Sequence, residues 1–204
     1  MNPGLLVVVS GPAGVGKGTV VARAREKNRD IVFSVSVTSR CPRPGEKDGE
    51  NYFFVSRERF QEMIREGALL EWVEYCGNYY GTPRAYVENE MKKGNVVLLE
   101  IEIEGANNVK KQYPDCISVF LTPPSIEELR RRLEKRGTEP PEVIEARMQR
   151  ALKEMEQLDK YDYVIKNISV EESADKLLEI IEKERNRIKN KNTGSGEDDK
   201  TSNI

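Results

Sequence analysis

A glycine-rich stretch near the amino end is the feature that most constrains the fold of this chain. It follows the apolar residues 5–9 and reads Ser10-Gly11-Pro12-Ala13-Gly14-Val15-Gly16-Lys17-Gly18-Thr19. A strand, a glycine-rich turn and a helix in this order let several backbone N–H groups converge on one anion. The stretch therefore predicts a phosphate-binding loop in which Lys17 follows the terminal phosphates of a nucleoside triphosphate. The alternative is a glycine-rich turn without a ligand, and the lysine and the flanking strand argue against it.

The end of the loop departs from the strict motif. Gly18 stands where that motif has Ser or Thr, and the hydroxyl is displaced to Thr19. This ending resembles that of adenylate kinase and its nucleoside monophosphate kinase relatives, in which no direct hydroxyl ligand to magnesium is required. We therefore expect Mg²⁺ with ATP, held by Glu100 at the end of the apolar run 95–100, directly or through water. An acid after four apolar residues is common, so the ligand stays open.

Length and composition exclude several classes of function. A chain of 204 residues favours one domain with inserted lobes. The net charge of −2 argues against non-specific binding of nucleic acid or a membrane surface. There is no histidine, which excludes imidazole bases and Ser-His or Cys-His nucleophiles but leaves phosphoryl transfer possible. Three cysteines, no visible signal peptide and no long apolar run lead us to expect a cytoplasmic protein.

Apolar runs typical of buried strands recur along the chain, at residues 5–9, 31–37, 95–100, 116–121 and 161–167. Helical patterns lie between them, so the sequence predicts an α/β core with a parallel sheet flanked by helices in three layers. This core comprises residues 4–36, 90–124 and 160–188.

Residues 37–89 break the alternation and predict a small mixed α/β lobe. Ser56 is expected to cap a helix over Arg57–Arg65, and a hairpin turn at Gly77-Asn78 follows a strand. Thr82 and Pro83 are expected to open the next helix.

Residues 125–159 predict two helices rich in arginine, joined by a Gly/Pro break. Ser125 and Glu128 form a capping box for the first of them. Such a pair is typical of a closing lid, and a charged hairpin that covers the sheet is the alternative. A terminal helix is expected to end near Ile188, and residues 189–204 are expected to be a disordered tail.

Arg40 and Arg43 lie in a proline-rich loop that follows the second apolar run. Pro44 disfavours the helical conformation at Arg43, so both arginines are expected on an extended segment that reaches the ligand crevice at the strand ends. A solvated basic loop is the alternative.

Taken in order, these motifs resemble guanylate kinase. The resemblance covers residues 4–188 and rests on the phosphate loop, Ser36-Val37-Thr38-Ser39-Arg40-Cys41-Pro42-Arg43-Pro44-Gly45-Glu46, Asn51-Tyr52-Phe53-Phe54, Glu71-Trp72, Gly77-Asn78-Tyr79-Tyr80-Gly81-Thr82 and Arg136-Gly137-Thr138-Glu139. It implies transfer of a phosphoryl group from ATP to GMP, with a GMP-binding lobe at about 37–89 and a helical lid at about 125–159.

The resemblance also assigns roles to individual residues. Those implied for GMP binding are Ser36, Arg40, Arg43, Tyr52, Glu71, Tyr80, Thr82 and Glu102. Glu71 would accept from the guanine N1–H and N2–H, and Glu102 stands where an Asp is frequent. Those implied for ATP binding are Gly11, Pro12, Ala13, Gly14, Val15, Gly16, Lys17, Gly18, Thr19 and Asn167. Those implied for catalysis are Lys17, Arg40, Arg43 and the lid arginines Arg136 and Arg147.

Two other readings compete with this one. Guanylate-kinase-like domains also occur as non-catalytic modules that bind partner proteins, but such modules typically lack a working phosphate loop. A related kinase could phosphorylate another small phosphate compound, against which Glu71 and Ser36 argue. Glu104 stands at a position where this family frequently has Gln, so the charge near the site stays open. The sequence leaves dGMP open as a second acceptor and does not give the oligomeric state.

Overall fold

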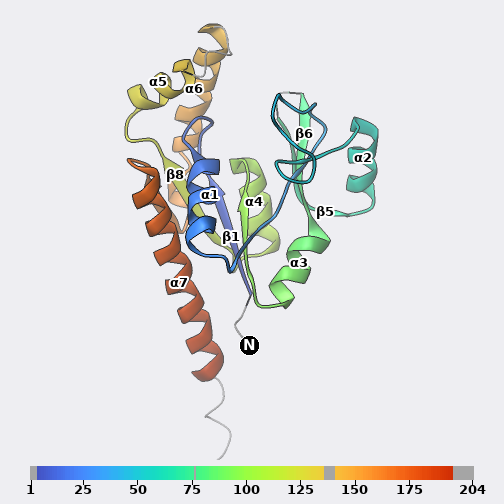
Figure 1. Ribbon diagram of the computed structural model, residues 1–204, viewed down its shortest axis with the longest axis vertical. Helices are drawn as coiled ribbons and strands as arrows, with labels where there is room; N and C mark the ends of the chain where they lie inside the picture. The colour runs from blue at the N-terminus through green and yellow to red at the C-terminus, as the bar shows by residue number, and fades with distance from the viewer. Residues whose placement is uncertain (1–3, 76, 136–140, 195–204) are drawn as a thin grey trace, which may run out of the picture.

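The computed structural model describes residues 4–75, 77–135 and 141–194 (Figure 1). Within these residues the larger sheet has five parallel strands. Their order is β2 (Ile31–Phe33), β7 (Val96–Glu100), β1 (Leu5–Ser10), β8 (Ile117–Thr122) and β9 (Tyr163–Lys166). β1 is buried along its whole length, as expected of a strand with both faces covered. The prediction of an α/β core with a parallel sheet is confirmed.

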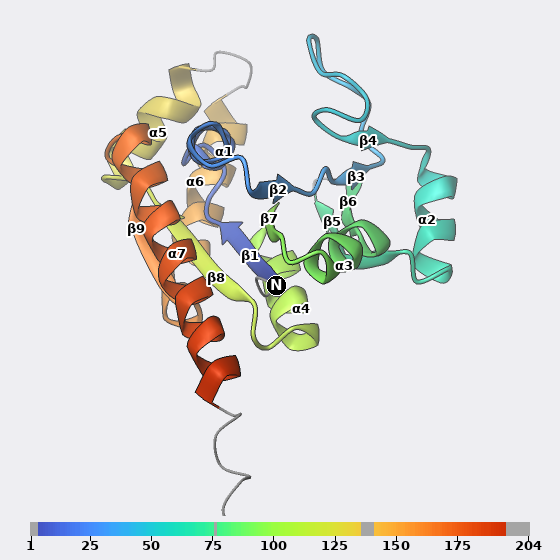
Figure 2. The same cartoon turned by 60° about the horizontal axis from the view of Figure 1, so that its bottom comes forward.

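Helices cover both faces of this sheet. One face carries α1 (Lys17–Lys27) and α7 (Val170–Gly194), and the other carries α3 (Arg84–Lys92) and α4 (Ile103–Gln112), as Figures 1 and 2 show. Successive residues of β1 point to opposite faces, so Val7 packs in the first cluster with Leu177 and Val8 packs in the second with Val109. The alternation of the core strands thus builds two apolar layers from one sheet.

The carboxyl ends of β1 and β7 lie side by side. Val9 is the register partner of Glu100, so the glycine-rich loop after β1 begins next to the acid that ends β7. The strands β2 and β7 lie on one side of β1, and β8 and β9 lie on the other. Ligands of open α/β sheets bind at such a point, where the strand order reverses.

The smaller sheet has four strands in the described residues. Their order is β4 (Phe53–Phe54), β3 (Val37–Thr38), β6 (Asn78–Pro83) and β5 (Leu69–Tyr75). It is covered by α2 (Arg57–Arg65), whose Phe60 is fully buried against it. The predicted cap is confirmed, because the Ser56 hydroxyl accepts a hydrogen bond of 3.1 Å from the backbone N–H of Arg59. β5 and β6 form the predicted hairpin, and Gly77 has a φ of +74° at its turn.

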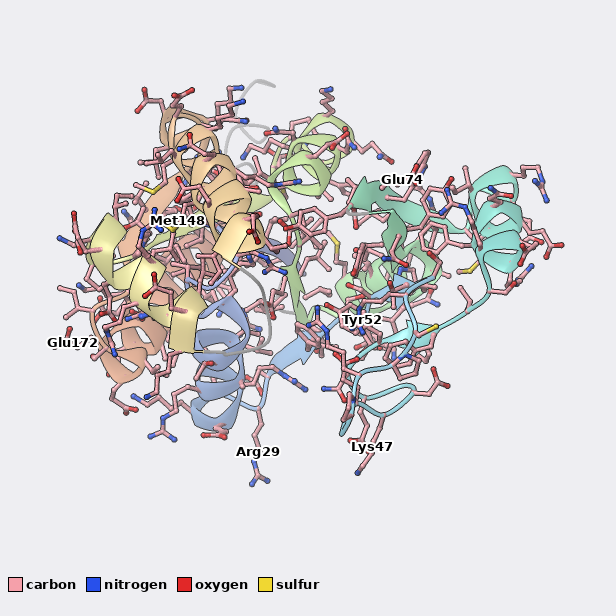
Figure 3. The ribbon with its side chains drawn as sticks, turned by 90° about the horizontal axis from the view of Figure 1, so that it is seen from above. Arg29, Lys47, Tyr52, Glu74, Met148 and Glu172 are labelled. Carbon is pink, nitrogen blue, oxygen red and sulfur yellow. The ribbon has the colours of Figure 1, made fainter. Side chains whose placement is uncertain are left out.

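Two further helices pack on each other through a cluster of their own, which includes Leu129, Leu133 and Met148. They are α5 (Ile126–Lys135) and α6 (Pro141–Met155), and a short 3-10 helix over Leu158–Lys160 leads from them to β9. Seen from above, α6 with Met148 lies in the same half of the view as α1, and the region with Tyr52 lies in the other half (Figure 3). The two excursions from the core are therefore separate from each other.

Two predicted elements differ in the structure. Residues 31–37 were expected to form one strand, but β2 ends at Phe33 and β3 begins at Val37 in the other sheet. The apolar pattern is the same in both halves, so it does not reveal where the chain leaves the core. The helix expected from Thr82-Pro83 begins at Arg84 instead, because residues 78–83 pair with β5 and the Thr82 hydroxyl is used elsewhere.

The helix ends also differ in detail. Ser125 accepts from the backbone N–H of Glu128 as predicted, but the Glu128 carboxylate binds Arg131 and Arg132 rather than closing the capping box. α7 continues to Gly194, the first glycine after Ser169, so the start of the predicted tail is helical. The rest of that tail, 195–204, lies outside the described residues. No described helix has the length and apolar character that crossing a bilayer requires.

Candidate active site

The glycine-rich loop curls tightly between β1 and α1. Gly11 has a φ of +149°, and a Cβ atom there would lie 2.4 Å from the backbone oxygen of Leu121. Gly16 has a φ of +98° and precedes the first residue of α1. Only glycine fits both positions, and the turn it allows points the unpaired N–H groups of the helix start toward the loop centre.

Lys17 is the first residue of α1 and turns back across the loop. Its side chain is buried, and Nζ donates a hydrogen bond of 2.5 Å to the backbone oxygen of Gly11. Glu100 lies beside the loop on the other side, since a Cβ atom on Gly18 would lie 3.3 Å from its carboxylate. The glycine that replaces Ser or Thr in the strict motif therefore leaves room for an acid.

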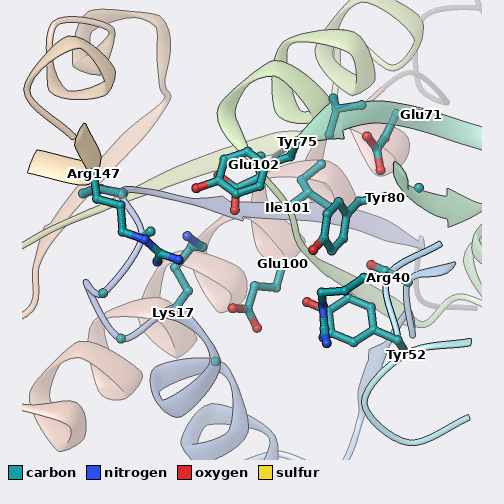
Figure 4. A pocket seen from close by; sticks show the side chains of 18 of the residues that line it. Lys17, Arg40, Tyr52, Glu71, Tyr75, Tyr80, Glu100, Ile101, Glu102 and Arg147 are labelled. Carbon is teal, nitrogen blue, oxygen red and sulfur yellow. The ribbon is translucent and has the colours of Figure 1, made fainter. Parts of the chain in front are cut away.

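The loop forms one end of a cavity of about 350 Å³ (Figure 4). Its lining comprises Pro12, Ala13, Gly14, Gly16, Lys17, Gly18, Thr19, Ser36, Arg40, Arg43, Tyr52, Glu71, Val73, Tyr75, Tyr80, Gly81, Glu100, Ile101, Glu102 and Arg147. Most of the predicted site residues are among them. Four are not, namely Gly11, Val15, Thr82 and Asn167, and Arg136 lies outside the described residues.

Arg40 lies at the opposite end of the cavity from Lys17 (Figure 4). Its guanidinium donates to both carboxylate oxygens of Glu46, at 2.8 and 2.9 Å, and its Cζ lies 5.4 Å from the ring centroid of Tyr52. The rings of Tyr52 and Tyr80 meet edge to face at 6.0 Å. The structure thus brings Arg40 and both predicted tyrosines together, with the exposed Arg43 also at the cavity wall.

Glu46 is a partner of these arginines that was not predicted from the sequence. Besides binding the side chain of Arg40, it accepts a hydrogen bond of 2.7 Å from the backbone N–H of Arg43. Burial raises the pKa of Glu46, but the hydrogen bonds from Arg43 and Arg40 outweigh it, so the pKa lies below its usual range. A charged Glu46 therefore fixes the loop that carries both arginines. Its place in the arginine-rich loop was a signal that could have found it.

Glu71 is a buried carboxylate in the wall of the cavity, only 5% exposed. The hairpin register pairs Glu71 with Thr82, whose hydroxyl donates a hydrogen bond of 2.7 Å to Oε1. On the other side, a Cβ atom on Gly105 of α4 would lie 2.4 Å from Oε2. Burial raises the pKa of Glu71 to about 7, although the bond from Thr82 lowers it. Thr82 is thus connected to the cavity through its hydrogen bond to Glu71. Gly105 was not predicted from the sequence as a site residue.

Glu100 and Glu102 place two further acids in the cavity. Burial raises the pKa of Glu100, Lys17 opposes this rise, and Glu102 adds to it. Among the described residues, Oε2 of Glu102 is buried without a hydrogen-bond partner, so this side chain holds an acceptor that a ligand N–H could satisfy. The same part of the chain has no group of three acids, cysteines or histidines placed to hold a metal ion.

Asn167 lies behind the loop rather than in the cavity lining. Its Nδ2 donates a hydrogen bond of 2.7 Å to the backbone oxygen of Val15, and its Oδ1 accepts one of 2.9 Å from the hydroxyl of Ser173. Asn167 therefore ties the glycine-rich loop to α7. Glu104, which left the local charge open, is exposed on α4 and is not part of the cavity lining.

The sequence model of the family described as "Guanylate kinase" matches residues 4–184. The chain is 50% identical to the guanylate kinase of Desulfitobacterium hafniense (strain Y51) over 190 residues, which covers 93% of this chain and 95% of the relative. It is 52% identical to the guanylate kinase of Halalkalibacterium halodurans over 178 residues, 87% of each chain. A crystal structure of guanylate kinase from Anaplasma phagocytophilum superposes with a TM-score of 0.77 at 38% identity, covering 91% of this chain and 88% of the other.

Proposed function

The chain belongs to the guanylate kinase family, and on that premise we propose that it transfers the γ-phosphoryl group of ATP to GMP, giving ADP and GDP. The observation that carries this proposal is the layout of one cavity. A glycine-rich anion-binding loop with Lys17 lies at one end, and the buried carboxylate of Glu71 lies in the wall of the other half. A triphosphate and a nucleobase that offers N–H donors would each meet complementary groups.

The donor nucleotide occupies the loop end. Backbone N–H groups of residues 13–19 and the positive end of α1 surround its phosphates, while Lys17 leaves the Gly11 oxygen to bind the terminal phosphates. Asn167 contributes by holding Val15, and its placement behind the loop supports an indirect role in ATP binding.

The acceptor occupies the opposite end. Guanidinium groups of Arg40 and Arg43 bind the phosphate of GMP, and the hydroxyls of Tyr52 and Tyr80 each donate one more hydrogen bond. An oxygen of this phosphate attacks the γ-phosphorus of ATP while the bond to the β,γ-bridging oxygen breaks. The second pKa of a phosphate monoester is about 6, so the attacking group is ionised at neutral pH and needs no general base.

Glu71 selects the base. Its carboxylate accepts from the N1–H and N2–H of guanine, with Thr82 holding the carboxylate in place. Glu102 offers its unpartnered oxygen to the exocyclic amine, and Ser36 adds a hydroxyl to the same end of the cavity. Adenine presents an acceptor at N1 and would leave the buried acid unpaired, and sites built to hydrogen-bond one substrate reject such analogues strongly. dGMP presents the same base and is therefore a candidate second acceptor.

The residues present fit Mg²⁺ held mainly by ATP. Magnesium usually binds through substrate phosphates, waters and one or two carboxylates. Glu100, beside Gly18 at the cavity, is the carboxylate that would hold it, directly or through water. When bound, the ion neutralises charge on the donor phosphates.

The lid completes the site. We place the core at residues 4–36, 90–124 and 160–188, the GMP-binding lobe at about 37–89 and the lid at about 125–159. Arg147 reaches the cavity from α6, and Arg136 is proposed as its partner from the resemblance. Closing these cations around the transferring group stabilises its oxygens and excludes water, which would otherwise accept the phosphoryl group. The substrates, and the free thiols of Cys41 and Cys116 among the described residues, suit a cytoplasmic enzyme.

A non-catalytic binding module is the competing reading. Such a module has no need for a lysine buried across a glycine loop or for a buried acid opposite it, and here both are retained. The intact cavity therefore supports the enzyme.

Two variants test the proposal in a coupled assay that follows ADP formation from ATP and GMP with Mg²⁺. Lys17→Met is expected to abolish turnover, and Glu71→Ala is expected to raise the KM for GMP strongly while changing the KM for ATP little. Lys111→Met, at an exposed position on α4, is the control and is expected to match the wild type. Wild-type turnover by Lys17→Met, or unchanged GMP kinetics in Glu71→Ala, would refute the assigned roles.

A further inference from the structure

A contact between the lid and the GMP-binding lobe is not explained by the roles given above. Arg150 lies on α6, one helical turn after Arg147, so the two side chains leave the same face of the helix. The guanidinium carbon of Arg150 lies 4.1 Å from the ring centroid of Tyr75, the last residue of β5. An arginine at this distance over a tyrosine ring makes a cation–π contact.

The orientation of Arg150 is set from within the lid. Its Nε donates a hydrogen bond of 2.8 Å to Oε1 of Glu154, one turn further along α6. Glu154 is itself only 8% exposed, so its carboxylate is held by packing rather than by solvent. The guanidinium is therefore anchored at one edge while its face covers Tyr75.

Tyr75 begins a row of rings that ends at the phosphate-binding arginine (Figure 4). It meets Tyr80 edge to face at 6.2 Å, and Tyr80 meets Tyr52 edge to face at 6.0 Å. The Cζ atom of Arg40 then lies 5.4 Å from the ring centroid of Tyr52. We call Tyr75, Tyr80 and Tyr52 the aromatic row. Each member touches the next, and the two outer contacts are with arginines from different parts of the fold.

From this continuity we propose that Arg150 is a positioning residue that clasps the lid to the aromatic row. The inference rests on the proposed function, because it assigns Tyr80 and Tyr52 to the GMP phosphate. Arg150 acts through Tyr75 and not on the reacting atoms. A GMP phosphate bound by the hydroxyls of Tyr52 and Tyr80 fixes the aromatic row and so favours the docked lid, while a lid closed over ATP favours the arranged row. The coupling is reciprocal, as linkage requires.

The coupling is measurable as a change in nucleotide affinity. A non-hydrolysable ATP analogue is titrated by calorimetry into the protein with and without GMP, and the ratio of the two affinities is the coupling factor. Arg150→Ala and Tyr75→Leu are each expected to lower this factor two- to five-fold, the range that a partly exposed cation–π contact provides. The double variant is expected to lower the factor no further than Tyr75→Leu alone, because Arg150 acts through the ring of Tyr75. Arg150→Lys, which retains a cation, is expected to restore part of the factor.

Lys153→Ala is the matched control, since it removes one positive charge from an exposed position of the same helix and is expected to keep the wild-type factor. Thermal unfolding midpoints of all variants verify that each is folded. Two results would overturn the role of Arg150 alone. One is a coupling factor in the double variant that is lowered by the product of the two single effects. The other is a coupling factor in Arg150→Ala that equals the factor in Lys153→Ala. Absence of GMP phosphorylation by the wild type would overturn the proposed function together with the clasp.

Discussion

The hydroxyl of Thr82 donates a hydrogen bond of 2.7 Å to the carboxylate of Glu71, across the two strands of one hairpin. The strand pairing therefore places Glu71, the group that we propose selects the base, opposite the hydroxyl that holds it. Gly105 closes the other side of the carboxylate, so its position is fixed from both directions.

Replacing Thr82 by valine removes the donor while keeping the shape of the side chain. A hydrogen bond to a charged group contributes about 1.5–3 kcal/mol, so the KM for GMP is expected to rise about ten-fold or more. The KM for ATP is expected to stay near the wild-type value. Thr82→Ser keeps a hydroxyl and should behave nearly as the wild type. Equal KM values for GMP in the valine and serine variants would contradict the role of this bond.

The pH dependence of GMP binding follows from the pKa of Glu71, which burial raises to about 7. Below that pH the carboxyl of the free protein carries a proton and does not accept from both guanine donors. The KM for GMP is therefore expected to fall as the pH rises from 6 to 8. Part of any change near pH 6 comes from the phosphate of GMP itself. The Glu71→Gln variant measures that part, because it has no carboxyl group at position 71. If its KM for GMP had the same pH profile as that of the wild type, the assignment of the pH dependence to Glu71 would be contradicted.

The same pKa predicts the sign of a stability change. A carboxyl whose pKa is higher in the folded than in the unfolded protein stabilises the fold at low pH, and this contribution is lost as the pH rises to about 7. Without nucleotide, the wild type is expected to lose stability relative to Glu71→Gln between about pH 4.5 and pH 7. Urea unfolding of both proteins at several pH values measures the difference, and a constant difference would count against a buried carboxyl with a raised pKa.

A methyl group at position 105 tests the space around Glu71 directly. Alanine is a better helix former than glycine, but its Cβ atom would lie 2.4 Å from Oε2 of Glu71 and must displace the carboxylate. Gly105→Ala is expected to raise the KM for GMP about ten-fold or more, a loss comparable to that of one charged hydrogen bond. Lys111→Ala on the exposed face of the same helix is the control. Wild-type GMP kinetics in Gly105→Ala would show that the carboxylate is not confined there.

Glu46 provides a test at the phosphate end of the acceptor site. Glu46→Gln keeps the size of the side chain but weakens its bonds to the guanidinium of Arg40 and the backbone of Arg43. The KM for GMP is expected to rise about three- to ten-fold, because a hydrogen bond to a neutral amide contributes less than one to a charged carboxylate. Glu50→Gln, at an exposed position of the same loop, should leave it unchanged. An effect of equal size in the two variants would point to the net charge of the loop instead.

Local sequence was sufficient for the core and for the phosphate loop. The apolar runs of β1, β7 and β8 are buried on both faces, so each reads as a strand without knowledge of its neighbours. Gly11 and Gly16 stand where the backbone requires glycine, which the spacing of the motif already indicated.

The remaining features depend on partners that are distant in the chain. Thr82 has the sequence signature of a helix cap, and only the hairpin register with Glu71 shows that its hydroxyl is used across the strands. The close approach of Gly105 to Glu71, and of Arg150 to Tyr75, joins elements whose relative positions no local pattern encodes. The chain leaves the core after Phe33 for the same reason, since the residues on both sides suit a strand.

The central claim is that one cavity joins a triphosphate to a guanine-selective acceptor site. It is tested most directly by a single assay in which the wild type receives ATP, Mg²⁺ and, in turn, GMP, AMP, UMP or CMP, with ADP formation as the readout. We predict rapid ADP formation with GMP and a rate lower by several orders of magnitude with the other three, because only guanine offers both donors to Glu71. No ADP formation with GMP, or equal rates with GMP and AMP, would contradict the account.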